Sequence, residues 1–142
     1  INYLYYLCDM KVSFDFDHTL SRKDVQSFAK DLVKEGHEVW IVTSRFSDEA
    51  AKEKKWHWIE GQNQKLFDVA EECGIKKENI QFTCMESKSV FLKNKGFIFH
   101  IDDDDIELMD IFESKDSCRA IHVDHFEWKE TCQDILKKNL AQ

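Results

Sequence analysis

The chain has 142 residues, of which 42% are hydrophobic and 34% are charged, and its formal net charge is −8. This length suits one domain with a substantial core, and the composition excludes wholesale disorder. The acidic balance disfavours binding of nucleic acid through bulk positive charge. With no proline and only four glycines, the chain is expected to be dense in regular elements joined by short loops.

Residues 1–9 are mostly apolar and precede a methionine, Met10. They are too short to span a membrane and lack the basic leading region of a signal peptide. We therefore interpret 1–9 as an upstream or added segment, with a docking strand as the alternative, and expect one domain over 10–142.

The first predicted elements are a strand, a helix and a second strand. Residues 11–16 have β-forming character, and Ser21 with Asp24 three residues later resembles an acidic capping box that opens a helix. Gly36 is a suitable stop for this helix. The nearly continuous apolar run 39–43 predicts a strand covered on both faces, as in a parallel sheet.

The rest of the chain continues this alternation and ends in an amphipathic helix. Helices are expected over 48–59, 63–73, 87–94, 104–112 and 126–139, and strands over 80–82, 97–101 and 119–123. Gly74 should close the second of these helices, and Phe126 is placed on the apolar face of the last. The order predicts an α/β protein, a three-layer Rossmann-like fold with a central parallel sheet of about five strands.

Polar side chains follow three of the predicted strands, and one more begins the helix that leads into the fourth strand. They are Asp15, Asp17 and Thr19 after the first strand; Thr43, Ser44 and Arg45 after the second; Lys88 before the fourth; and Asp102 and Asp103 at its end. Each taken alone has a structural explanation, because such residues commonly cap turns and helices. Their arrival in order at one edge of a parallel sheet, where ligands bind, favours a functional site.

These stretches resemble the haloacid dehalogenase superfamily. FDFDHTL is similar to its DxDx[TV] signature, VWIVTS to its second motif and FIFHIDD to its fourth. Lys88 is matched to the third motif because it stands at a helix start one helix before the acidic strand, with Lys93 and Lys95 as alternatives. His18 stands where glycine is frequent in the family.

The resemblance implies covalent catalysis through an aspartyl-phosphate. Asp15 is then the nucleophile and Asp17 the general acid and base, while Thr43 and Lys88 hold and neutralise the phosphoryl oxygens. Further substrate contacts are expected from the side chains near these motifs, namely His18, Thr19, Ser44 and Arg45.

The resemblance also implies a magnesium ion, and an all-oxygen set of ligands suits Mg²⁺. The expected metal site is formed by Asp15, the carbonyl of Asp17, and the acidic pair Asp102 and Asp103. Of that pair Asp103 is the expected direct ligand, and Asp102 is expected to orient Lys88 or a water.

The predicted function is Mg²⁺-dependent hydrolysis of a phosphomonoester. The spacing between motifs leaves no room for a large cap domain, so an open site is expected. The substrate is expected to be a nucleotide, another small phosphomonoester or a nucleic-acid terminal phosphate; the spacing resembles that of the phosphatase half of polynucleotide kinase-phosphatases. A phosphoryl-accepting or non-catalytic regulatory module on the same fold is the alternative, although the order of the motifs disfavours a two-component receiver domain.

The five cysteines have no paired spacing, which indicates free thiols in a reducing compartment and hence a cytoplasmic protein with no membrane partner. Cys118, His122 and His125 form only a loose zinc-like spacing. A calcium loop beginning at Asp102 is excluded, because Glu107 stands where the loop needs glycine.

Overall fold

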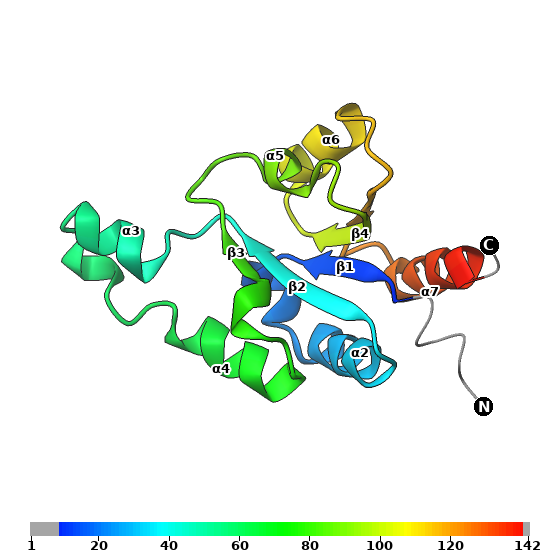
Figure 1. Ribbon diagram of the computed structural model, residues 1–142, viewed down its shortest axis with the longest axis horizontal. Helices are drawn as coiled ribbons and strands as arrows, with labels where there is room; N and C mark the ends of the chain where they lie inside the picture. The colour runs from blue at the N-terminus through cyan, green and yellow to red at the C-terminus, as the bar shows by residue number, and fades with distance from the viewer. Residues whose placement is uncertain (1–8, 141–142) are drawn as a thin grey trace.

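The computed structural model of the protein describes residues 9–140, so the predicted segment 1–9 lies outside them apart from Asp9. Its centre is one five-stranded parallel sheet with the strand order β3-β2-β1-β4-β5 (Figure 1). The strands are β1 (Lys11–Phe14), β2 (Glu38–Thr43), β3 (Ile80–Phe82), β4 (Phe97–Asp102) and β5 (Arg119–His122). The predicted α/β architecture with about five parallel strands is confirmed.

Helices cover both faces of the sheet. They are α2 (Lys23–Lys34), α3 (Asp48–Glu53), α4 (Gln64–Cys73), α5 (Lys88–Leu92), α6 (Asp105–Glu113) and α7 (Trp128–Leu140), with the short turns η1 (Phe16–Leu20), η2 (His57–Ile59) and η3 (Lys77–Asn79). Helices α2, α4 and α7 bury one apolar cluster against the sheet, and α5 and α6 bury a second one on the opposite face (Figure 1). The result is the three-layer arrangement that the alternation of elements predicts.

The strand order places a switch point at the centre of the sheet. From β1 the chain builds outward to β2 and β3, and then returns to the other side of β1 for β4 and β5. In open α/β sheets, ligands bind beyond the carboxyl ends of the strands where the order reverses. Asp15 follows β1 and Asp102 ends β4, so the two carboxylates lie on either side of this point.

Two predicted helix boundaries are wrong. Ser21 does not cap α2, because its hydroxyl accepts the N–H of His18 within the preceding turn and the helix begins at Lys23. The helix expected over 48–59 ends at Glu53, and Lys55 adopts a left-handed conformation with φ of 60°. The chain then folds back, and Trp56 packs on the ring of Phe46, which precedes the helix.

Phe126 is also misplaced by the prediction for the last helix. It precedes α7 and is 85% exposed, while the buried face of the helix is formed by Trp128, Cys132, Ile135 and Leu136. Gly36 and Gly74 do follow the ends of α2 and α4, with φ of 90° and 83°. Side chains other than glycine rarely adopt such values, which is why these positions mark helix ends.

Within residues 9–140, no helix combines the length and apolar character needed to cross a membrane. The four cysteines in this range are free thiols, and Cys73, Cys118 and Cys132 are buried.

Candidate functional site

The carboxyl ends of the parallel strands form one edge of the sheet, which we call the rim. The carboxylate of Asp15 lies at its centre, after β1. Its backbone N–H continues the sheet by donating to the carbonyl of Ile101, at 2.8 Å. The residue is 5% exposed, and its two oxygens accept hydrogen bonds from Lys88 at 2.8 Å and from the hydroxyl of Thr19 at 3.2 Å. Thr19, predicted to contact substrate, is thus fully buried and supports the Asp15 carboxylate.

Lys88 is the lysine of the site. Its side chain is 2% exposed and its Nζ lies 2.8 Å from Asp15 and 2.6 Å from Asp102. Burial alone would lower the pKa of Lys88, but the two carboxylates outweigh burial and raise it. Lys93 and Lys95, the alternatives in the sequence, are exposed.

Asp102 is held by four donors. Its Oδ1 accepts the backbone N–H groups of Asp103 and Asp104, and its Oδ2 accepts from Lys88 and from Nε2 of His100 at 2.7 Å. Burial opposes ionisation, but the hydrogen bond from His100 and the charge of Lys88 hold the pKa of this carboxyl below its usual range. Because a carboxylate offers about four lone-pair sites, Asp102 is saturated by protein donors.

Behind Asp102, the buried pair His100 and Ser13 completes the chain of contacts. If Nε2 of His100 donates to the ionised Asp102, its Nδ1 must accept the hydroxyl hydrogen of Ser13, which lies 2.7 Å away. Burial lowers the pKa of His100 and favours this neutral form. This series of hydrogen bonds, from Ser13 through His100 to Asp102, fits the expectation that Asp102 orients Lys88.

Three carboxylates at the rim form the group that can hold a metal ion. One oxygen each from Asp15, Asp102 and Asp103 lies within 4.8 Å of the others, and no other such group of histidine, cysteine or acidic side chains occurs in residues 9–140. Cys118, His122 and His125 are therefore not brought together as a zinc site. Since Asp102 is already saturated, Asp15 and Asp103 are the carboxylates with room for a cation.

The electrostatics of Asp15 also indicate unbalanced negative charge. Burial and the nearby Asp102 charge raise the pKa of Asp15 to about 8, although Lys88 works in the opposite direction. One ammonium cannot neutralise two carboxylates, so the second charge is unfavourable without a further cation. An all-oxygen cluster of this kind suits a hard ion such as Mg²⁺.

Asp17 is outside this group of three carboxylates and pairs with Arg45. Nη2 and Nε of Arg45 lie 2.7 and 2.9 Å from the two carboxylate oxygens. These hydrogen bonds lower the pKa of Asp17. The same guanidinium donates to the carbonyl of Gln62 at 2.8 Å and to the side chain of Asn63 at 3.3 Å. Arg45 thus joins the rim to the segment that precedes α4.

The remaining predicted residues lie around these groups. Thr43 is fully buried at the end of β2, and its hydroxyl accepts the N–H of Arg45 at 3.3 Å. Ser44 is partly exposed and its carbonyl accepts the N–H of Met85. His18 is exposed and has a φ of 59°, a left-handed conformation that explains why a glycine would be tolerated there.

The sequence did not reveal two polar groups at this rim. Glu107 on α6 accepts the backbone N–H of Lys88 at 3.3 Å and lies 4.0 Å from its Nζ. Thr83, after β3, has a buried hydroxyl without a hydrogen-bond partner in the described part of the chain. Glu107 carried no signal in the sequence, because it lies within a helix and outside the motifs, whereas Thr83 directly follows the predicted strand 80–82, and this position at a strand end was the available signal.

No protein-family model matches the chain, and comparison with curated proteins finds no match. The chemistry of the rim therefore follows from its own residues, contacts and charges.

Proposed function

We propose that the protein is a Mg²⁺-dependent phosphomonoester hydrolase of the haloacid dehalogenase type, with Asp15 as the nucleophile. The observation that carries the proposal is the contact of one buried lysine, Lys88, with the carboxylates of Asp15 and Asp102 at the switch point of the sheet. A carboxylate attacks phosphorus only when it is held in line and the negative charge of the phosphoryl group is masked. Lys88 and Thr19 hold Asp15, and Lys88 supplies positive charge beside it.

In the first half-reaction, an oxygen of Asp15 forms a bond to phosphorus while the bond from phosphorus to the leaving oxygen breaks. Asp17 donates its proton to that oxygen. In the second half-reaction, Asp17 takes a proton from water, and the water oxygen attacks phosphorus and releases Asp15 and inorganic phosphate. Thr43, with nearby backbone amides, is the proposed holder of a phosphoryl oxygen.

The contact between Asp17 and Arg45 fits a resting state. An ionised Asp17 cannot donate a proton, and its bidentate partner favours the ionised form. A phosphate group that draws Arg45 toward itself would weaken this pairing and let the pKa of Asp17 rise. Binding of the substrate would then favour the protonated form of Asp17, which is the form that acts as the general acid.

Mg²⁺ would be held by the side chains of Asp15 and Asp103 and by the backbone carbonyl of Asp17. When bound, it supplies positive charge that offsets the phosphoryl oxygens. The facing carboxylates of Asp15 and Asp103 support this assignment, because like charges at this separation favour a cation between them.

A phosphate-release assay with Mg²⁺ tests the proposal. The substrates are nucleotides, sugar phosphates, 3′-phosphorylated oligonucleotides and phosphopeptides, and the matched variant is Asp15→Asn, which keeps the shape of the side chain. We expect release by the wild type, none by the variant, and an acid-stable phosphoenzyme sensitive to hydroxylamine in the wild type only. Undiminished release by Asp15→Asn would remove Asp15 from the mechanism.

A further inference from the structure

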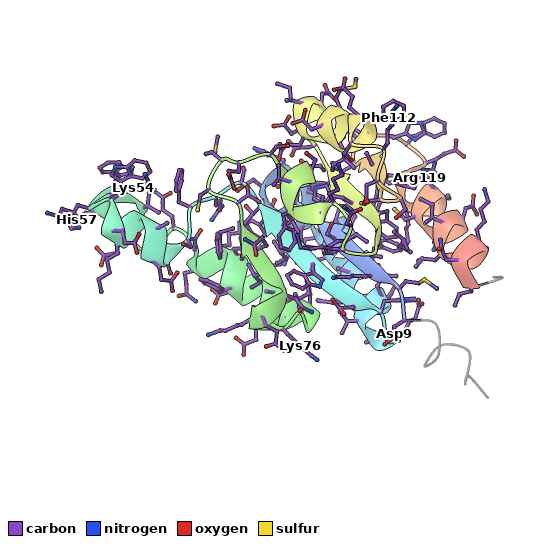
Figure 2. All side chains as sticks on the ribbon, turned by 45° about the horizontal axis from the view of Figure 1, so that its top comes forward. Asp9, Lys54, His57, Lys76, Phe112 and Arg119 are labelled. Carbon is purple, nitrogen blue, oxygen red and sulfur yellow. The ribbon has the colours of Figure 1, made fainter. Side chains whose placement is uncertain are left out.

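A row of aromatic rings leads outward from the rim along the segment 46–61. The ring of Phe46 meets Trp56 edge-on at a centroid distance of 5.0 Å, and Trp58 stacks on Trp56 at 5.6 Å with an interplanar angle of 28°. The segment, which carries α3 and η2, extends beyond the carboxyl ends of the strands (Figure 1). Lys54 and His57 lie at its outer end (Figure 2).

The outermost ring of this row is open to solvent. Trp56 is partly buried, and its contact with Phe46 accounts for the folding back of the segment. Trp58 is 66% exposed. A tryptophan that stacks on one side and faces water on the other offers a flat surface to a ligand.

Lysines are concentrated in one turn of this segment, although four acidic side chains, Asp48, Glu49, Glu53 and Glu60, leave residues 46–61 with a net charge of −1. Three lysines, Lys52, Lys54 and Lys55, fall within four residues, although the chain has a net charge of −8. The Nζ of Lys54 lies 5.0 Å from the ring centre of Trp56. A cavity of about 370 Å³ is lined by Lys52, Trp56 and His57, and also by the acidic residues Asp48 and Glu60. The lysines therefore lie directly before the two tryptophans in the chain, and Lys54 lies over the ring of Trp56.

Arg45 connects this surface to the reaction centre. The guanidinium that pairs with Asp17 also binds the carbonyl of Gln62, next to Gly61, which lines the cavity. Phe46, the first ring of the row, is the neighbour of Arg45 in the chain. A ligand that begins at Asp15 and passes Arg45 therefore meets the aromatic row.

We propose that the surface formed by Phe46, Trp56, Trp58 and the adjacent lysines binds the bases and backbone of a single-stranded nucleic acid whose terminal phosphate is the substrate. The inference rests on the proposed phosphatase function and names its substrate class. Stacked aromatic rings with interspersed cations are the general means of binding unpaired bases and their phosphates. Trp58 lies two ring-to-ring steps of 5.0 and 5.6 Å beyond Phe46, so the ligand must extend well past the reacting phosphate.

Binding is tested first, in the Asp15→Asn background so that no turnover occurs. The probe is a fluorescein-labelled oligothymidylate of ten nucleotides with a 3′-phosphate, followed by anisotropy with Mg²⁺, and an oligouridylate of equal length separates DNA from RNA. Trp58→Ala should weaken binding roughly tenfold, and Trp58→Phe should restore most of it, because base stacking needs an aromatic face. Binding that is absent, or equal in Trp58→Ala, would overturn the proposal.

Catalysis then separates this inference from the proposed function. In the Asp15-containing protein, Trp58→Ala should lower kcat/KM for the phosphorylated oligonucleotide roughly tenfold and leave that for glycerol 2-phosphate unchanged. Phe112→Ala is the matched control, since Phe112 is 76% exposed and lies far from the segment (Figure 2).

Equal losses on both substrates, or no preference of the wild type for the oligonucleotide, would overturn the inference while the phosphatase function stands. Oligonucleotide binding that depends on Trp58, without phosphate release from any substrate, would overturn the phosphatase function and leave the binding surface supported.

Discussion

The ammonium group of Lys88 lies 2.6 Å from Oδ2 of Asp102, and both side chains are almost completely buried. A buried charge pair is costly to disrupt from one side, because the remaining charge loses its partner. Lys88 also donates to a second carboxyl group, that of Asp15, so its removal leaves the buried Asp102 charge without its cation and Asp15 without one of its hydrogen-bond donors. This geometry makes the stability of the protein a direct readout of the site.

Lys88→Met should therefore lower the free energy of unfolding by roughly 3–5 kcal/mol and abolish turnover. Denaturant titration followed by circular dichroism measures the loss. Adding Asp102→Asn to Lys88→Met should recover part of the stability but none of the activity. Lys93→Met is the control at an exposed lysine and should change the stability by less than about 0.5 kcal/mol. Equal losses for the two lysine variants would contradict the assigned role of Lys88.

Asp17→Asn should separate the two half-reactions. The variant keeps the nucleophile but lacks the acid and base, so a substrate with a good leaving group should still phosphorylate Asp15. Hydrolysis of the phosphoenzyme, which needs a base, should slow more. Rapid-quench trapping with p-nitrophenyl phosphate should then show a longer-lived phosphoenzyme than in the wild type. Equal slowing of both steps would assign Asp17 another role.

Arg45→Met should raise the pKa of Asp17, because the hydrogen bonds from Arg45 are what lower it. If protonated Asp17 is the general acid, the alkaline decline of kcat/KM for a substrate with a poor leaving group should move to higher pH. The variant should also raise KM if Arg45 binds phosphate. A pH–rate profile unchanged in shape would show that Arg45 does not control the proton of Asp17.

The raised pKa of Asp15 predicts how stability depends on pH without metal. Burial keeps this carboxyl protonated up to a pH of about 8 in the folded protein, whereas it ionises near its ordinary value of about 3.9 in the unfolded chain. The folded state then binds more protons in this window, so its stability falls as the pH rises from about 4 to 8.

Thermal melts in a chelator at pH 5 and pH 8 test the effect, with Asp15→Asn as the reference. The melting temperature of the wild type should fall relative to that of the variant by roughly 5 °C or more. Mg²⁺ should remove the difference, because it favours the ionised form. Parallel melting curves of the two proteins across this range would mean that Asp15 ionises normally.

Metal binding should stabilise the assembled rim. At a Mg²⁺ concentration about 100 times the dissociation constant, binding adds about 2.7 kcal/mol and should raise the melting temperature by several degrees. Asp103→Ala should lose most of this response and most of the activity. A shift that survives in Asp103→Ala would exclude the proposed ligand set.

Asp105→Ala is the matched control, because the Asp105 side chain is 90% exposed and contacts only His122 among the ion pairs of the described chain. It should respond to Mg²⁺ like the wild type. Asp104 is unsuitable as a control, since its side chain accepts the N–H groups of Ile106 and Glu107 and caps α6. If Asp103→Ala and Asp105→Ala respond alike, the acidic run attracts cations only diffusely.

The sequence by itself determined the alternation of strands and helices and the parallel sheet. Continuous apolar runs such as 39–43 can only be covered on both faces, and Gly36 and Gly74 end helices because glycine accepts a positive φ. The order of polar residues after the strands also indicated their common rim, since the carboxyl ends of parallel strands lie at one edge.

Tertiary structure decided which of these residues meet. The place of Lys88 at a helix start favoured it but left Lys93 and Lys95 as alternatives, because only the packing of α5 on the sheet buries one of the three beside Asp15. Local spacing could not show that Asp102 is saturated by His100 and Lys88, or that Arg45 pairs with Asp17 across 28 residues. Nor could local spacing predict that α3 ends at Glu53, after which Trp56 packs on Phe46. Such contacts join residues distant in the chain, and periodicity carries information only about neighbours.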